Sequence, residues 1–287
     1  MLAPWTIALL ALTGLLLAAI LRFSRRYLAG SPAQASFTRW TGVAAAAIVT
    51  LITAQDLLVF TLAWTALGLC LHQLLTLYPD RPAALLAARK KFLISRLGDL
   101  PLLAALFLTR DASWSFASLN AAAPDDAVAL CLVAAALIKS AQFPFHTWLP
   151  DTMETPSPVS ALMHAGIINA GAILLLKTAP ALLASPAALA LLTITGAFTA
   201  IFASWVMLTQ ASIKRQLAFS TVAQMGFVLL ECGLGQFSLA LVHIIGHALY
   251  KAHAFLASGN AVTYTGTVSG DSMSGSYNTP DCSYADA

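Results

Sequence analysis

Charged residues are scarce in this chain of 287 residues: Asp, Glu, Lys and Arg make up 9% of it, whereas 59% is hydrophobic. A soluble domain usually carries about 25% charged residues. A soluble chain so poor in charge would expose large apolar patches. The composition therefore excludes an ordinary soluble protein and predicts an integral membrane protein. The net charge of +3 is small, and no basic-aromatic pattern accompanies it, so nucleic-acid binding is not indicated.

Metal-binding and redox motifs are missing as well. The four cysteines, Cys70, Cys131, Cys232 and Cys282, are scattered without a CxxC pair. Three of them lie in apolar runs, where a thiol packs as a small hydrophobic group. No HExxH motif occurs either. We therefore expect no metal site and no cofactor in this chain.

Short alternating segments typical of a membrane β-barrel are also absent, and continuous apolar runs take their place. Runs of about 20 apolar residues predict transmembrane helices, which satisfy their own backbone hydrogen bonds in lipid. The first run has no basic leader, so we interpret it as a span rather than a signal peptide. The predicted fold class is all-α, a polytopic bundle of about nine spans: 3–21, 41–54, 57–78, 92–109, 127–149, 159–180, 188–210, 217–234 and 237–262.

Basic residues gather in three connections that fall on one side if the spans alternate. The positive-inside rule then predicts that these connections are cytoplasmic and that the amino terminus is outside, in the inner (plasma) membrane of a cell. The three clusters contain Arg22, Arg25, Arg26 and Arg39, then Arg81, Arg89, Lys90, Lys91 and Arg96, and finally Lys214 and Arg215.

Three lysines, Lys139, Lys177 and Lys251, fall inside predicted spans. A lysine at mid-bilayer costs roughly 3 kcal/mol, so it normally faces a bundle interior or a water-filled path. Lys139 lies near the middle of the span 127–149, in LIKSAQFPFHTWLPD, where Pro144 predicts a break in the helix. A broken helix suits a hydrated cavity. The alternative for Lys139 is a side chain that snorkels to the surface.

Further titratable side chains follow at helical spacing. His243, His247 and Lys251 recur every four residues and form one stripe, which favours proton relay over structural hydrogen bonding or a metal site. His164 lies on the span that also holds Lys177, and for Lys177 snorkelling competes evenly with a role in transport.

Two further charged features lie near span ends. Arg96 and Asp99 are three residues apart at the start of the span 92–109, where they can pair in an ion path or as a structural contact. Glu231 near the end of its span is expected to reach the headgroups. Residues 1–262 are thus predicted to form one transmembrane domain, and the tail 263–287, rich in Ser, Gly, Thr and Asp, is predicted to be disordered.

The run LIKSAQFPFHTWLPDTMETPSPVSALMHAG resembles the signature of the proton-translocating antiporter-like subunits of respiratory complex I and multisubunit cation/proton antiporters. Two further segments are similar to later parts of that family: SIKRQLAFSTVAQMGF and LVHIIGHALYKAHAFLASG. The resemblance implies two inverted five-helix repeats, each with a broken helix. It also implies a proton or cation pathway through Lys139, His164, Lys177, His243, His247, Lys251, Arg96 and Asp99.

One departure narrows the resemblance. Complex I subunits carry a Trp-Glu-Gly motif whose glutamate pairs with the channel lysine, whereas here AWTALGLCLHQLL has Thr65 at that position. His72 and YPDRPAALLAARKKFLISRLGD resemble instead the membrane subunit of Dab-type inorganic carbon transporters. That resemblance implies a zinc carbonic-anhydrase-like partner that forms bicarbonate from carbon dioxide. Zinc is expected in the partner. Protons or sodium ions that this chain conducts are expected to drive that partner.

Full-length relatives continue for several more helices, whereas this chain enters a polar tail after HALYKAHAFLASGNAV. The sequence is therefore interpreted as truncated at its C-terminus, with the second repeat incomplete. Two alternatives stay open beside carbon transport. One is a proton-translocating subunit of NADH:quinone oxidoreductase or of a cation/proton antiporter. The other is a truncated scaffold that does not conduct.

Overall fold

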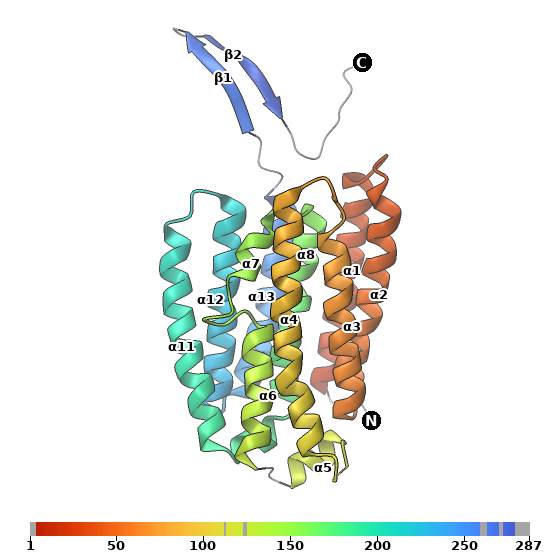
Figure 1. Cartoon of the computed structure of the whole chain (residues 1–287), viewed down its shortest axis with the longest axis vertical. Coiled ribbons are helices and arrows are strands. Elements are labelled where there is room, and N and C mark those ends of the chain that lie inside the picture. Colours follow the sequence, from red (N-terminus) through yellow and green to blue (C-terminus); the bar gives the residue numbers. More distant parts are fainter. Residues whose placement is uncertain (1–3, 112, 123–124, 259–262, 270–271, 279–287) are drawn as a thin grey trace.

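The computed structural model describes residues 4–111, 113–122, 125–258, 263–269 and 272–278. Long helices run side by side and form one bundle (Figure 1). They are α1 (Pro4–Tyr27), α2 (Ala33–Thr53), α3 (Leu57–Leu75), α4 (Pro82–Leu108), α6 (Asp126–Lys139), α8 (Ser157–Ala165), α9 (Ala170–Lys177), α11 (Pro186–Leu208), α12 (Ile213–Gly233) and α13 (Phe237–Ala257). Short helices connect them: α5 (Phe116–Ala121), α7 (Trp148–Asp151), α10 (Ala179–Leu183), η1 (Thr152–Glu154) and η2 (Ile167–Asn169).

The bundle is apolar on the outside and polar at selected points inside. Trp205 and Leu208 on α11 are 73% and 75% exposed, whereas Lys251 on α13 is fully buried and Lys91 on α4 is 2% exposed. In water both features would cost free energy, because exposed apolar surface is disfavoured and a buried charge loses its hydration. A bilayer around the bundle removes the first penalty, and a polar interior relieves the second.

Six segments among the described residues are long and apolar enough to cross a membrane. They comprise α1, α2, α3, α11, α13 and the stretch Ser157–Lys177, which includes α8, η2 and α9. Helices α4 and α12 are long enough to cross a membrane, but no stretch of that length in them is sufficiently apolar and poor in charge. Helix α6 is short, with 14 residues. The total of nine spans, and their relation as inverted repeats, therefore remain predictions.

Local sequence explains where two of these helices begin. The Asp56 side chain accepts a hydrogen bond of 2.8 Å from the Val59 backbone N–H and so caps α3, at the turn that Gln55 and Asp56 predict. Pro82 occupies the first turn of α4, where its missing N–H costs nothing. Helix α4 thus begins at Pro82, ten residues before the predicted start of this span at residue 92.

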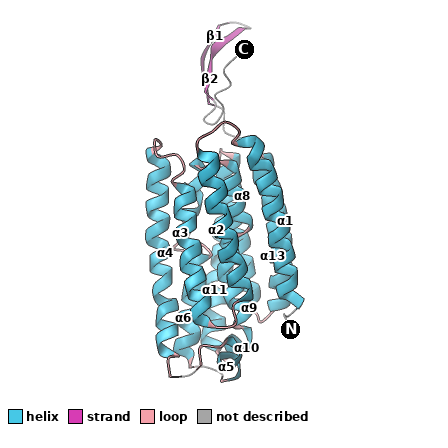
Figure 2. Cartoon of the chain, turned by 90° about the vertical axis from the view of Figure 1, so that its right-hand side faces the viewer, coloured by secondary structure: helices cyan, strands magenta, loops and turns pink. Residues whose placement is uncertain are grey.

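The connections alternate between the two ends of the bundle. The α1–α2, α3–α4 and α11–α12 connections lie together at one end, opposite the end marked N (Figure 1). Helices α5 and α10 lie at the other end (Figure 2). One basic cluster flanks the α1–α2 connection and another flanks the α11–α12 connection. Arg81 lies in the α3–α4 connection, and Arg89 and Lys90 follow it in α4. The same-side placement that the charge pattern predicts is therefore present.

Two of the helical runs are interrupted inside the bundle. Helix α6 ends at Lys139, and helical structure resumes only at Trp148. Between them the Phe143–Pro144 peptide bond is cis and Ala141 has a positive φ of 53°. The break predicted at Pro144 is thus present, but the helix ends five residues earlier. A second interruption, at Gly166 and η2 between α8 and α9, was not predicted.

The polar tail contains two strands that its composition did not predict. β1 (Thr263–Ser269) and β2 (Ser272–Asn278) pair as an antiparallel hairpin. Thr, Tyr and Val in these stretches favour extended structure. The disorder predicted for 263–287 does not describe these two stretches, and the rest of that segment lies outside the described residues.

Candidate functional site

Lys139 lies at the C-terminal end of α6 and not in the middle of a helix as predicted. Its Nζ donates a hydrogen bond of 3.4 Å to the Trp64 carbonyl oxygen and lies 4.4 Å from the centre of the Trp64 ring. Trp64 Nε1 donates to Asp99 Oδ1 at 3.1 Å. Trp64 on α3 therefore links a buried ammonium to a buried carboxylate, a role that the sequence analysis missed.

Arg96 and Asp99 form an ion pair on α4, with Arg96 Nη2 3.0 Å from Asp99 Oδ2. Because α4 begins at Pro82, the pair lies within the helix and not at the start of the span as predicted. Asp99 is buried, and Arg96 keeps partial exposure. The pair is thus brought together with Trp64 and Lys139.

Lys91 is a charged residue whose position the sequence analysis predicted wrongly. It was assigned to a cytoplasmic connection, but its Nζ donates a 2.6 Å hydrogen bond to the Gly68 carbonyl oxygen inside the bundle. Lys91, Ser95 and Asp99 are spaced four residues apart and share the buried face of α4. That spacing was visible in the sequence. The predicted helix start at residue 92 concealed it.

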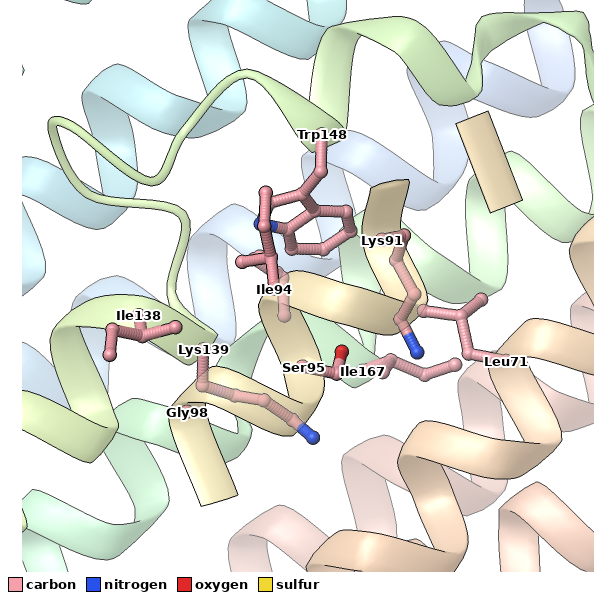
Figure 3. A pocket seen from close by; sticks show the side chains of 10 residues that line it. Leu71, Lys91, Ile94, Ser95, Gly98, Ile138, Lys139, Trp148 and Ile167 are labelled. Atoms are coloured by element: carbon pink, nitrogen blue, oxygen red, sulfur yellow. The ribbon is translucent and has the colours of Figure 1, made fainter. Parts of the chain in front are cut away.

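A small pocket lies beside Lys139 and Lys91 (Figure 3). It measures about 10 Å³, which is near the lower limit for one water molecule. Its lining comes from α3, α4, α6, α7 and η2 and contains Leu71, Lys91, Ile94, Ser95, Gly98, Ile138, Lys139, Trp148, Ile167 and Ile168.

The interrupted segment between α6 and α7 is held by polar and aromatic contacts. The Phe143 backbone N–H donates to Thr199 Oγ1 on α11 at 3.2 Å. The buried His146 ring stacks on Phe143 and meets Phe202 edge-on. Neither Gln142 Oε1 nor His146 Nδ1 has a hydrogen-bond partner among the described residues. Buried polar atoms of this kind usually bind water.

His164, His247 and Lys251 form a second buried group, between α8, α12 and α13. Lys251 Nζ donates to the Leu217 carbonyl oxygen at 3.0 Å. His164 Nδ1 lies 3.0 Å from Thr221 Oγ1, and its ring stacks on Phe255 at 4.3 Å. His164 Nε2 and both ring nitrogens of His247 have no partner among the described residues. The structure thus brings together three of the predicted residues in one polar group.

His243 continues this group along α13. Its Nδ1 lies 2.8 Å from Glu231 Oε1 and its Nε2 lies 2.7 Å from Gln224 Oε1. Glu231 was predicted to reach the headgroups and instead pairs with His243, because α12 packs against α13. In the described part of the chain, no three His, Cys, Asp or Glu side chains are grouped as metal ligands.

Lys177 is separate from both groups. Its Nζ donates a 2.8 Å hydrogen bond to the Ala54 carbonyl oxygen, directly after the end of α2. The ammonium also lies 5.4 Å from the Trp5 and Phe116 rings. Lys177 is buried rather than snorkelling, and its contacts tie α9 to the α2–α3 connection. The structure does not bring it into contact with the other predicted site residues.

Comparison with known families decides the general class. Residues 54–275 match the transmembrane family of NADH:quinone oxidoreductases and Mrp antiporters. The chain belongs to this antiporter family. It is accordingly a multi-pass membrane protein, and all the predicted pathway residues lie within the matched range.

Individual members of the antiporter family show the same relationship. The chain is 47% identical over 265 residues to the probable inorganic carbon transporter subunit DabB2 of Halothiobacillus neapolitanus, which covers 89% of this chain and 48% of that protein. It is 36% identical to NADH-ubiquinone oxidoreductase chain 5 of Metridium senile, over 84% of this chain and 42% of that protein. The chain therefore spans about half the length of the curated relatives it matches.

A solved structure of an antiporter-family complex shares the fold. The Mrp complex from Dietzia sp. DQ12-45-1b superposes with a TM-score of 0.82 at 31% identity, covering 88% of this chain and 29% of that chain. These relatives are subunits of transporter, antiporter or respiratory complexes. The chain thus shares the antiporter-type membrane fold of such subunits.

Proposed function

We propose that this chain belongs to the membrane subunit of an energy-coupled inorganic carbon transporter. Protons or sodium ions pass through its polar interior and drive a zinc carbonic-anhydrase-like partner subunit. The partner converts carbon dioxide to bicarbonate, and zinc resides in the partner. We place the assembly in the inner (plasma) membrane, with the amino terminus outside and the basic connections in the cytoplasm.

The observation that carries the proposal is the burial of Lys139 against Trp64, one side chain away from Asp99. An ammonium inside an apolar bundle is costly, so intramembrane lysines are rare and commonly mark an ion path. The second group, His164, His247 and Lys251, supplies titratable side chains with unused ring nitrogens, which bridging water can join. Together they provide stations for ion transfer within the bundle.

Sequence relationships support carbon transport over quinone-linked proton pumping. The identity is 47% to a probable inorganic carbon transporter subunit and 36% to a complex I subunit. Thr65 stands where complex I subunits have the glutamate that pairs with the channel lysine. Asp99, reached through Trp64, is the carboxylate near Lys139 here.

The test is uptake of labelled inorganic carbon by cells that produce the whole transporter with its partner. We expect Lys139→Ala to reduce uptake to the background of cells without the transporter, because it removes one station of the ion path. Arg25→Ala, at an exposed site near the end of α1, is the matched control and should leave uptake intact. A protonophore should abolish wild-type uptake if protons are the driving ion.

The uptake assay and a co-purification experiment separate the alternatives. Unchanged uptake in Lys139→Ala would contradict the proposal and favour a scaffold. Co-purification with quinone-linked subunits, in place of a soluble zinc protein, would favour the oxidoreductase alternative.

A further inference from the structure

The His243 ring on α13 lies between two side chains of α12. Its Nδ1 is 2.8 Å from Glu231 Oε1, and its Nε2 is 2.7 Å from Gln224 Oε1. Gln224 and Glu231 are about two helical turns apart, so both lie on the side of α12 that packs against α13. Both ring nitrogens of His243 are therefore in hydrogen bonds, whereas those of the neighbouring His247 have no partner among the described residues.

The two contacts decide how many hydrogens the His243 ring carries. An ionised carboxylate only accepts, so Nδ1 carries a hydrogen and donates it to Glu231. While the Gln224 amide presents its oxygen, Nε2 donates as well, and the ring is a cation with two N–H groups. If the amide turns over, its NH2 group donates to a bare Nε2, and the ring is neutral. The same three side chains thus fit two states that differ by one proton.

Glu231 is the counter-charge for the cationic state. Helix α13 packs against α1, α8, α9 and α12, and Glu231 is the one acidic residue on these helices, all of whose residues the structure describes. Their other titratable side chains are Arg22, Arg25, Arg26 and Tyr27 on α1, His164 on α8, Lys177 on α9, Lys214, Arg215 and Cys232 on α12, and His247, Tyr250, Lys251 and His253 on α13. A charge in an apolar interior is expensive without a counter-charge, so the cationic ring depends on Glu231.

We propose that Gln224 and Glu231 are positioning residues of the ion path. Glu231 keeps a hydrogen on Nδ1 of His243, and Gln224 turns over as Nε2 gains or loses a proton. In the gain, a hydronium ion in the path gives its proton to Nε2, an N–H bond forms and a water molecule is left. In the reverse step Nε2 returns the proton to water, and the amide NH2 group donates to the bare nitrogen. The inference rests on the proposed function, because it places both residues on the polar stripe of α13.

Turning of the amide also separates two proton positions on the stripe. While Nε2 is bonded to Gln224, it offers no position to water, and the proton stays on His243. When the amide moves away, water can join Nε2 to His247, whose ring nitrogens lack partners among the described residues. Gln224 therefore controls when the proton moves along α13, and Glu231 controls which nitrogen keeps its hydrogen.

The test is solid-state NMR of the whole transporter, with its native partners, in lipid bilayers. Histidine and glutamine carry ¹⁵N labels, and the variants His243→Asn and Gln224→Leu identify the two sets of signals. We expect the neutral His243 ring to carry its hydrogen on Nδ1. As the pH is lowered, Nε2 should become protonated, and the Gln224 amide signal should shift with the same midpoint. A merely structural contact would leave the amide signal unchanged.

Uptake of labelled inorganic carbon gives the functional readout. Gln224→Leu keeps the bond to Glu231 but takes the amide from Nε2, so uptake should fall by roughly tenfold, the effect of one lost hydrogen bond to a charged group. Gln216→Leu, at an exposed position near the start of α12, is the matched control and should leave uptake intact. Glu231→Leu should move the hydrogen of the neutral ring to Nε2, where Gln224 Oε1 accepts it.

A neutral wild-type ring with its hydrogen on Nε2 would overturn the proposal. An amide signal of Gln224 that ignores the protonation of His243, or equal uptake by Gln224→Leu and Gln216→Leu, would overturn it as well. Gln224→Met provides a second variant if Gln224→Leu does not fold. The spectra are recorded without transport, so failure of this inference is distinguishable from failure of the carbon-uptake experiment.

Discussion

At the scale of single residues, the buried Asp99 carboxylate supplies the negative charge beside the cations Arg96 and Lys139. It accepts from Trp64 and pairs with Arg96, so its removal leaves buried cations uncompensated. We expect Asp99→Asn to lower the free energy of unfolding by about 3 kcal/mol, because breaking a buried pair strands its partner. The loss should appear as a lower melting temperature in nanodiscs.

A double-mutant cycle provides the control for this residue. Adding Arg96→Gln to Asp99→Asn removes the stranded charge, so the double variant should lose less than the sum of the two single variants. Asp111→Asn, in an exposed pair with Arg110, should change the melting temperature little. Additive losses would show that Arg96 and Asp99 do not depend on one another.

Residue identity was more predictable from the sequence than residue surroundings. The interior positions of Lys139 and Lys251 followed from the cost of charge in apolar runs, and burial confirms them. Trp64 could not be predicted, because its contacts join α3 to residues 35 and 75 positions away. Lys91 was missed for a local reason, namely a helix start placed too late.

At the scale of helices, close packing of α11 on α12 depends on glycine. A Cβ on Gly196 would lie 2.6 Å from the Leu230 backbone nitrogen, and one on Gly226 would lie 2.7 Å from the Ala200 nitrogen. Small residues let helix backbones approach in membranes. We expect Gly196→Ala to lower the free energy of unfolding by about 1–3 kcal/mol, because backbone atoms must move.

Gly14→Ala on α1 is the matched helical control, since nothing lies within 4 Å of the Cβ it adds. Alanine favours a helix over glycine by about 1 kcal/mol, so this variant should not lower the melting temperature. If the two variants melted alike, the close approach of α11 and α12 would not be tight in solution.

Helix existence was predictable from the long apolar runs, whereas interruptions were only partly predictable. Pro144 predicts the break after α6, because proline disrupts the interior of a helix. Gly166 and η2 carry no comparable signal, and the break there directly follows α8, which packs against α13 and α1. The hairpin of β1 and β2 was likewise hidden by a composition typical of disorder.

At the scale of the whole molecule, the asymmetry of charge predicts orientation in the membrane. Basic residues flank the α1–α2 and α11–α12 connections, whereas Asp111, Asp125 and Asp126 lie near α5 at the opposite end. The positive-inside rule places the basic end in the cytoplasm. We expect a cysteine at Ala29, exposed after α1, to react with a membrane-impermeant maleimide only when the cytoplasmic face is accessible.

A cysteine at Ala122, exposed after α5, is the matched probe of the opposite end and should react in intact cells. Cys70 and Cys232 are buried, so they contribute little background, whereas the partly exposed Cys131 and the Cys282 of the tail are replaced by serine. Labelling of Ala29→Cys in intact cells, with protection of Ala122→Cys, would reverse the orientation. The proposed partner would then meet the membrane at the α5 end, and the basic connections would face away from the compartment in which bicarbonate accumulates.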